Sequence, residues 1–401
     1  MKMLRKTIKA IVVIVLLKVV TLILDRLSPD SIMFHRQFLF SLQILVVVWL
    51  LVSLLLFIFK AGKSWVARFL PVLIVMAVLG VDILFSFWIE NPSGIPGFLR
   101  KEFKDYYAAF ERNVIEYEPC SVFDSTYSFK IIPGLAFNYG NIEYRNNYVV
   151  NSESLRDDEG ALMGPQVICV GNAYTIGVGA DQDKTFPSLL EKDINQLVLN
   201  TGNTSYGTYR EMKRIAESDT SYLKYIVVQY SKYDVYENAA YIDGRPPFKV
   251  TSDSLYKKAR TEYRWKREYF PGKYAMTISY NWAKKMVNKL RQKRHFLSAD
   301  PVVSADYFLK VLDRFKPAPH VKIIVTEVND FRDLNSGFLP AVDSLLKKPE
   351  FSSLRNMVQT TSVADVLDRG DYYIIDANLR SSGHQKIARR IADIILKDSA
   401  Q

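Results

Sequence analysis

The sequence predicts a three-layer α/β/α domain of the flavodoxin-like type, with a five-stranded parallel sheet, preceded by three transmembrane helices. Three observations lead to this fold class. The first 90 of the 401 residues contain three long apolar stretches. Farther along, short apolar runs alternate with amphipathic segments, as in parallel sheets that are buried on both faces. One of these runs enters a glycine-rich turn and a helix, QVICVGNAYTIGVGADQDKTF at 166–186, the kind of position where open α/β sheets bind ligands.

The three apolar stretches cover residues 8–24, 38–59 and 69–89, close to the ~20 residues that cross a bilayer. A signal peptide has one short apolar core, so three stretches in succession predict retained anchors in a segment 1–90. Basic residues flank the first stretch and the link between the other two: Lys2, Arg5, Lys6, Lys9, Lys60, Lys63 and Arg68. By the positive-inside rule, we expect a bacterial inner (cytoplasmic) membrane protein with a cytoplasmic N-terminus and a periplasmic or otherwise extracytoplasmic C-terminal domain.

Two charged residues, Lys18 and Asp82, lie inside the first and the third apolar stretch. An ionisable side chain in hydrocarbon costs about 2.5–3.5 kcal/mol on insertion scales unless it is paired or hydrated. We therefore expect Lys18 and Asp82 to contact each other, since the two spans run in the same direction. The alternative is that each charge reaches the membrane surface or faces a partner protein.

The outer part begins with a Pro/Gly-rich break at 91–97 and a predicted stalk helix at 98–117. A β-hairpin region at 127–150 completes a lead-in, 91–150, to a domain at 151–401. Apolar runs predict the five strands of that domain at 166–171, 196–201, 225–230, 321–328 and 372–376. Amphipathic segments predict helices, among them 186–192, 209–217, 305–315 and 383–396.

Four segments of this domain resemble, in order, the sequence blocks of the SGNH/GDSL hydrolases. They are GNAYTIGVGA with TFPSLL (171–180 and 185–190), LNTGNTSYGTYRE (199–211), IVVQYSKYDVYEN (226–238) and DANLRSSGHQKIA (376–388). The segment NSESLRD at 151–157 is also similar to the lead-in of membrane-attached members. The resemblance covers roughly residues 151–398. It implies an SGNH-hydrolase-like fold with a cleft at the ends of the strands.

The positions that carry the family's chemistry are substituted here. Ala173 stands at the nucleophilic serine, Ser205 at an oxyanion-hole glycine, Tyr233 at an asparagine and Asn378 at the catalytic histidine. Ala173 has no oxygen, and Asn378 cannot take up a proton near neutral pH. We therefore expect no catalytic residue, no cofactor and no metal. The resemblance places seven further residues around the cleft: Gly171, Asn172, Thr175, Asn203, Asp234, Asp376 and His384.

Three of the cleft residues carry specific expectations. The hydroxyl of Thr175 is expected to cap the following turn, and His384 to lie at the surface or in a capping role. Tyr233 is expected to fill the space that an acyl group would enter. Cys120 and Cys169 have no metal-type spacing, and we expect Cys169 to be a buried free thiol and not the disulfide partner of Cys120.

Net charge separates the classes of partner. The first 100 residues hold 11 of the 53 Lys and Arg and 4 of the 42 Asp and Glu, so seven of the eleven excess positive charges lie there. This distribution speaks against nucleic-acid binding by the outer domain. An insertion at about 239–301 contains a basic, aromatic segment at 257–294. Two interpretations of this segment stay open. In one, it binds an anionic polymer, lipid head group or sugar; in the other, it is a solvated helix whose aromatic residues face the core.

The sequence thus predicts a membrane-anchored, extracytoplasmic SGNH-hydrolase-like pseudoenzyme. It would act as a binding or scaffolding subunit of a cell-envelope assembly for glycans or secretion, because membrane-anchored relatives take part in polysaccharide O-acylation. Expected partners are the membrane, other membrane or envelope proteins, and a glycan or anionic polymer. One alternative is an acyl-ester hydrolase or polysaccharide O-acyltransferase with a displaced catalytic set. Another is a transmembrane assembly subunit whose outer domain is a spacer.

Overall fold

The computed structural model describes residues 65–267, 272–289 and 300–400, together with Val12, Val15, Leu16 and Val19. The chain forms two compact units, Met1–Glu111 with Lys266–Gln292, and Arg112–Trp265 with Lys293–Gln401. Apart from those four residues, the first two predicted spans lie outside the described part of the chain, and so does Lys18. Its contact with Asp82 stays a prediction. None of the helices in the described ranges has the length and apolar composition required to cross a membrane.

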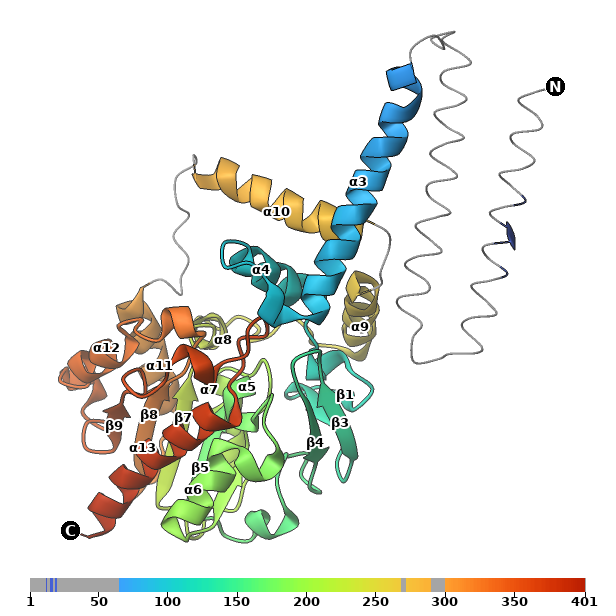
Figure 1. Cartoon of the computed structure of the whole chain (residues 1–401). Helices are drawn as coiled ribbons and strands as arrows, with labels where there is room; N and C mark the ends of the chain where they lie inside the picture. Colours follow the sequence, from blue (N-terminus) through green and yellow to red (C-terminus); the bar gives the residue numbers. More distant parts are fainter. Residues whose placement is uncertain are drawn as a thin grey trace. The chain divides into compact units, whose positions relative to one another are not determined.

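The described residues of the first unit form α3 (Trp65–Glu90), η2 (Pro92–Gly94), a short 3₁₀ helix, α4 (Arg100–Phe110) and α10 (Lys273–Lys289). The basic insertion therefore supplies a helix, α10, that packs against α3 and α4 (Figure 1). The buried carboxylate of Asp82, on α3, accepts hydrogen bonds from the amides of Gly272 (3.0 Å) and Ala275 (2.8 Å). Because a helix N-terminus carries unpaired amides and partial positive charge, Asp82 caps α10.

The second unit is built on a five-stranded sheet. Its strands are β5 (Val167–Gly171), β6 (Val198–Asn200), β7 (Tyr225–Tyr230), β8 (Lys322–Glu327) and β9 (Val358–Thr361). All neighbours pair in parallel, in the order β6-β5-β7-β8-β9. This is the strand order of flavodoxin-like sheets. The prediction of a five-stranded parallel α/β sheet is confirmed.

Helices cover both faces of the sheet, as Figure 1 shows. One face packs against α6 (Phe186–Ile194) and α13 (Ser381–Ser399). The other packs against α7 (Thr208–Ala216), α8 (Asp234–Ile242), α11 (Pro301–Phe315) and α12 (Phe338–Leu345). Side chains of β5 alternate between the two cores, with Val167 and Cys169 on the α13 side and Ile168 and Val170 on the α11 side. Because both faces are covered, the strand has no polar face, and its residues read as a continuous apolar run.

The fifth strand is not where the sequence predicts it. Residues 372–376 contribute only an isolated bridge between Tyr372 and Leu379, and β9 forms the sheet edge instead. The amides of Ile374, Ile375 and Asp376 donate to the carboxylate of Glu143, at 2.6, 3.0 and 3.0 Å. These amides are therefore not available for pairing with a neighbouring strand. The apolar run at 372–376 is buried without being a strand.

Two antiparallel hairpins precede the sheet. β1 (Ser121–Asp124) pairs with β2 (Ser128–Ile131), and β3 (Ala136–Gly140) pairs with β4 (Arg145–Val149). The second pair confirms the predicted hairpin in 127–150. Aromatic residues of both hairpins, among them Tyr127, Phe129 and Tyr148, pack on Ile176, in the short helical turn after β5, and on Tyr206, in the loop after β6. The hairpins therefore cover loops at the carboxyl ends of the strands.

Short elements and one longer helix complete the second unit. They are η3 (Ile115–Tyr117), η4 (Glu159–Leu162), α5 (Ala173–Ile176), η5 (Gln182–Lys184), α9 (Asp253–Arg267), η7 (Phe331–Asp333), η8 (Pro349–Phe351) and η9 (Arg369–Asp371). The predicted stalk helix is shorter than expected, because α4 ends at Phe110 and a separate 3₁₀ turn, η3, follows. Both cysteines, Cys120 and Cys169, are buried and free, as expected for Cys169.

Candidate functional site

The turn between β5 and α5 lies at the carboxyl end of a central strand, where β5 is flanked by β6 and β7. In a sheet with this strand order, that position is the topological switch point. Gly171 ends the strand with φ of +153°, and a Cβ atom there would lie 2.1 Å from the Thr175 hydroxyl and 2.6 Å from the Gln229 side-chain oxygen. No side chain fits at Gly171, so the turn requires glycine.

A buried glutamine on β7 holds this turn. Oε1 of Gln229 accepts a hydrogen bond from the amide of Asn172 (3.1 Å), and Nε2 donates to the carbonyl of Val328 (3.4 Å). The Thr175 hydroxyl lies 3.2 Å from the same Oε1 and 3.3 Å from the Val170 carbonyl, either of which accepts its proton. Thr175 therefore fixes the turn from inside. Gln229 is not identified from the sequence, although a single amide side chain in the apolar run YIVVQY indicates a buried hydrogen-bonding role.

A second buried support comes from the NSESLRD segment. The Arg156 side chain is almost fully buried and lies 3.5 Å from the centre of the Tyr148 ring. It donates to four main-chain carbonyls, at 2.7 to 3.1 Å, those of Asn147, Ile176, Gly177 and Ala180. Asn151 of the same segment accepts the amides of Glu153 and Leu155. This segment thus has a structural role, which is to hold the loop that follows α5.

The residue at the start of α5 has no reactive group. Asn172 caps α5 by accepting the amide of Tyr174 (3.2 Å), and Ala173, half-buried, follows it. The Tyr174 hydroxyl donates to the carbonyl of Ala377 (3.3 Å), which ties this turn to the loop before α13. The segment that follows β5 and the segment that precedes α13 are therefore brought together.

The carboxylate of Asp376 is buried and surrounded by donors. It accepts hydrogen bonds from the Tyr144 hydroxyl (2.8 Å) and from the side-chain amides of Asn141 and Asn378, and Nε of Arg112 lies 3.9 Å away. Asn378, at the predicted histidine position, thus donates to Asp376 and accepts no proton from a nucleophile. These donors satisfy the buried carboxylate oxygens, so Asp376 positions a loop.

The loop after β6 contributes Asn203 and Ser205. The main-chain amide of the buried Asn203 donates to the Gly171 carbonyl (3.0 Å), so Asn203 supports the turn from the β6 side. Ser205 is exposed, has φ of +61°, and its main-chain carbonyl accepts a hydrogen bond from the guanidinium of Arg210. Burial raises the pKa of Glu116, although Ser205 and Arg210 favour the ionised form. Ser205 offers a hydroxyl and not the small glycine of an oxyanion hole.

Tyr233 and Asp234 begin α8 and differ completely in environment. Tyr233 is 65% exposed, so its ring stands in solvent and, contrary to the expectation, does not fill an enclosed acyl entrance. We use the term rim for the exposed and half-buried residues that follow β5, β6 and β7, namely Ala173, Ser205, Tyr233 and Tyr236, together with Arg112 beside Asp376. Asp234 is buried and accepts the Ser231 amide (2.9 Å). Burial raises the pKa of Asp234 well above its usual range, and it does the same for the adjacent buried carboxyl of Glu211. Asp234 is therefore a structural acid.

His384 is not at the surface, contrary to one expectation. It is fully buried, and its Nδ1 accepts the amide of Phe186, the first residue of α6 (3.2 Å). Burial, assisted by the positive charge of Arg156, lowers the pKa of His384 to about 3. The imidazole is neutral at physiological pH and caps a neighbouring helix. The other histidine that the structure describes, His320, is exposed next to β8.

The aromatic residues of the basic insertion divide between interior and surface. Tyr256 and Tyr274 are buried, and the hydroxyl of Tyr263 bonds to the Val114 amide (3.0 Å) and to Glu118. Tyr280 and Trp282 are 64% and 52% exposed. The interior-facing interpretation therefore holds for the first three rings and not for the last two.

The site as described provides shape and hydrogen bonding without a nucleophile paired to an imidazole. Within the described ranges, no cluster of His, Cys, Asp and Glu could hold a metal ion. No family model, curated protein or solved structure matches the chain. The resemblance to SGNH/GDSL hydrolases stays a prediction from the sequence blocks.

Proposed function

We propose that the second unit is a non-catalytic, SGNH-hydrolase-like binding domain that holds a glycan of the cell envelope at the strand-end edge. One observation carries this proposal. The turn after β5 is shaped by Gly171, Gln229 and Thr175, yet the residue presented by that turn is Ala173. A preserved turn without a reactive oxygen favours binding over bond cleavage.

The chemistry of the rim favours a sugar ligand. The rings of Tyr233 and Tyr236, 65% and 45% exposed, offer flat apolar faces with a polar edge. The hydroxyl of Ser205 and the guanidinium of Arg112, whose side chain is 40% exposed, add hydrogen-bonding groups. Rings that stack on sugar faces, beside groups that bond hydroxyls or carboxylates, suit a neutral or acidic glycan.

Binding to glycan fragments tests this function. The detergent-purified full chain is titrated by calorimetry with neutral and uronic-acid oligosaccharides, with and without O-acetyl groups. Tyr233→Ala is expected to weaken binding at least tenfold, because it removes an exposed ring from the rim. Tyr222→Ala, which removes a similarly exposed tyrosine (67%) elsewhere, serves as the matched control. Equal affinities of wild type and Tyr233→Ala would contradict the proposal.

We also propose that the first unit attaches the protein to the bacterial inner membrane and that the second unit lies outside the cytoplasm, where it joins other envelope proteins. Support comes from the apolar stretches at 8–24, 38–59 and 69–89 and their flanking charges. Apolar side chains of α3, among them Met76, Val81, Leu84 and Phe87, are also exposed. Extraction of membranes with alkaline carbonate should leave the protein in the pellet, and release into the supernatant would contradict attachment.

A second candidate is an acyl-ester hydrolase or acyltransferase with a displaced catalytic set, because Ser205 acts on the pKa of the Glu116 carboxyl, which burial raises. Glu116 would accept the proton of the Ser205 hydroxyl during attack on an acyl group, and a raised carboxyl pKa suits a general base. Hydrolysis of p-nitrophenyl acetate that disappears in Ser205→Ala and in Glu116→Gln would support this candidate. Turnover that is absent, or unchanged in both variants, would exclude it.

A further inference from the structure

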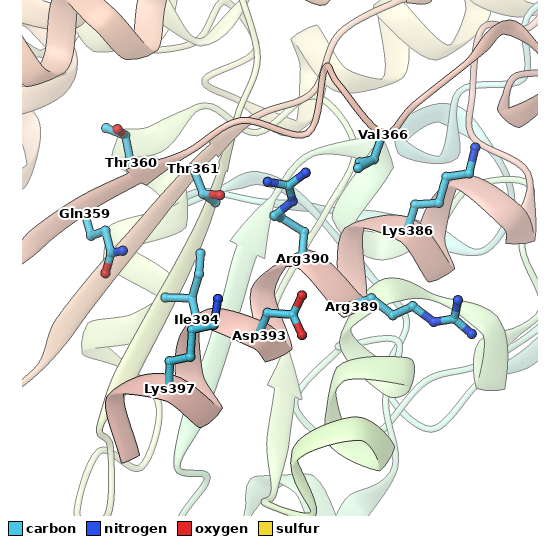
Figure 2. Close-up of a pocket in the computed structure, with 10 residues that line it drawn as sticks. All are labelled: Gln359, Thr360, Thr361, Val366, Lys386, Arg389, Arg390, Asp393, Ile394 and Lys397. Atoms are coloured by element: carbon cyan, nitrogen blue, oxygen red, sulfur yellow. The ribbon is translucent and has the colours of Figure 1, made fainter. Parts of the chain in front are cut away.

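A groove of about 430 Å³ runs between the edge strand β9 and helix α13, as the close-up in Figure 2 shows. Its walls are Gln359, Thr360 and Thr361 of β9, Val366, and one face of α13 with Lys386, Arg389, Arg390, Asp393, Ile394 and Lys397. The volume falls within the ~300–1,000 Å³ of ligand-binding clefts. None of these residues belongs to the strand-end site.

The outer edge of β9 is open to strand addition. β9 pairs with β8 on one side, and no other described strand pairs with it. Sheet edges are usually protected by charged side chains, proline or bulges. The β9 sequence, VQTT, contains none of these, and Gln359 is exposed. The Val358 amide donates to the Leu354 carbonyl (2.9 Å), so the open part of the edge is the main chain beyond Val358. It lies beside the groove, and peptides use such an edge when they add a strand to a sheet.

The charge of the groove is uneven along α13. Near its start, Lys386 pairs with Asp368 (2.8 Å) and Asp371 (2.7 Å), and Arg390 pairs with Asp365. Arg389 and Lys397, by contrast, are exposed and form no ion pair with another described residue. Asp393 is the one carboxylate among the groove residues named above. The α13 residues that line the groove thus carry excess positive charge.

The spacing of these cations suits an extended chain. Arg389 and Lys397 are eight residues apart on a helix, a rise of about 12 Å. In a β-strand, side chains on one face recur every second residue, so those four residues apart are separated by about 13 Å. Carboxylates at alternate positions of an added strand would therefore face the cationic wall, while the intervening side chains point away.

We propose that this groove docks an extended acidic segment of a partner protein, which pairs with the free edge of β9 as a sixth strand and directs alternate carboxylates toward α13. A polyanionic glycan is less suited, because it lacks the regular row of amides and carbonyls that a sheet edge pairs with. Pairing of two β9 edges is also less suited, because it would bring two cationic α13 walls together.

A defined peptide tests the proposal. Fluorescein-labelled (Glu-Thr)₄ is titrated with the detergent-purified full chain, and binding is followed by fluorescence anisotropy. We expect saturable binding that weakens as salt is raised. An analogue with N-methylated amides at alternate residues has the same charge but cannot donate along one edge, and is expected to bind at least tenfold more weakly. The lysine counterpart, (Lys-Thr)₄, should not bind.

Charge reversal of the wall gives the second arm. Arg389→Glu/Lys397→Glu should weaken (Glu-Thr)₄ binding at least tenfold, whereas Lys224→Glu/Lys249→Glu, which reverses two exposed lysines outside the groove, should leave it within twofold. Equal binding of the N-methylated peptide, or tighter binding of dextran sulfate, would assign a polyanion site and overturn strand addition. A dimer seen by sedimentation and disrupted by the reversal would assign the edge to a second copy. Absence of saturable peptide binding would also overturn the proposal.

Discussion

The residues that support the β5 turn and the residues of the rim differ in burial and in hydrogen bonding. Behind the turn, Arg156 and Gln229 are buried and hydrogen-bonded to main-chain groups, and Gly171 has no room for a side chain. On the rim, Ala173 is unreactive and Tyr233 is 65% exposed. The shape of this turn therefore depends on buried polar contacts and not on a reacting group.

The largest expected effect is on the support. Arg156→Met removes donors from four main-chain carbonyls and should lower the free energy of unfolding by about 3–5 kcal/mol, as when one member of a buried polar set is removed. Chemical denaturation of the full chain in detergent measures the change. Arg156→Lys, which keeps the charge but has fewer donors, should fall between Met and wild type. A loss below about 1 kcal/mol for Arg156→Met would show that the support is dispensable.

A smaller loss is expected at the second support. Gln229→Leu keeps the volume but leaves the Asn172 amide without its acceptor, and should cost about 2–3 kcal/mol because a buried donor becomes unsatisfied. Denaturation curves of Gln229→Leu and Gln229→Asn give the comparison. Stability equal to wild type in Gln229→Leu would mean that this contact does not hold the turn.

The pH dependence of stability provides a third comparison. The pKa of His384 is about 3 in the folded chain and near 6.5 when unfolded, so the unfolded state takes up a proton first as pH falls. The contribution of His384 is complete above pH 6.5 and is lost as pH falls toward 3, with about 2 kcal/mol gone at pH 5. His384→Asn keeps an acceptor for Phe186 without this titration. Between pH 7 and pH 5, the free energy of unfolding of His384→Asn should therefore fall by about 2 kcal/mol less than that of wild type. An equal pH dependence of stability in the two proteins would contradict a neutral buried imidazole.

The rim should contribute least to stability. Tyr233→Ala and Ala173→Ser change exposed or half-buried positions and should alter the free energy of unfolding by no more than about 0.5 kcal/mol. Thermal unfolding of both variants beside Gln229→Leu measures the contrast. If Tyr233→Ala destabilised the protein as much as Gln229→Leu, the distinction between support and rim would fail.

The sequence predicts those strands that are buried on both faces, because their residues form a continuous apolar run. β5 and β7 follow this rule, because both of their faces are covered and their residues are nearly all apolar. β9 is not predicted, because this edge strand, VQTT, has no apolar run. Residues 372–376 have such a run but form no strand, because their amides donate to Glu143. Long-range polar contacts, such as Asp82 with the start of α10, have no local sequence signal. The same holds for the partners of Asp376.

Reaction of the purified full chain with a fluorophosphonate probe tests the central claim most directly, because the probe labels serines that are activated for attack on acyl groups. Mass spectrometry of the digested protein locates any adduct. With Ala173 at the turn and no activated serine on the rim, no serine should be modified at a probe concentration that fully labels a serine esterase control. Stoichiometric labelling of Ser205, accompanied by loss of ester turnover, would show that the site still cleaves bonds.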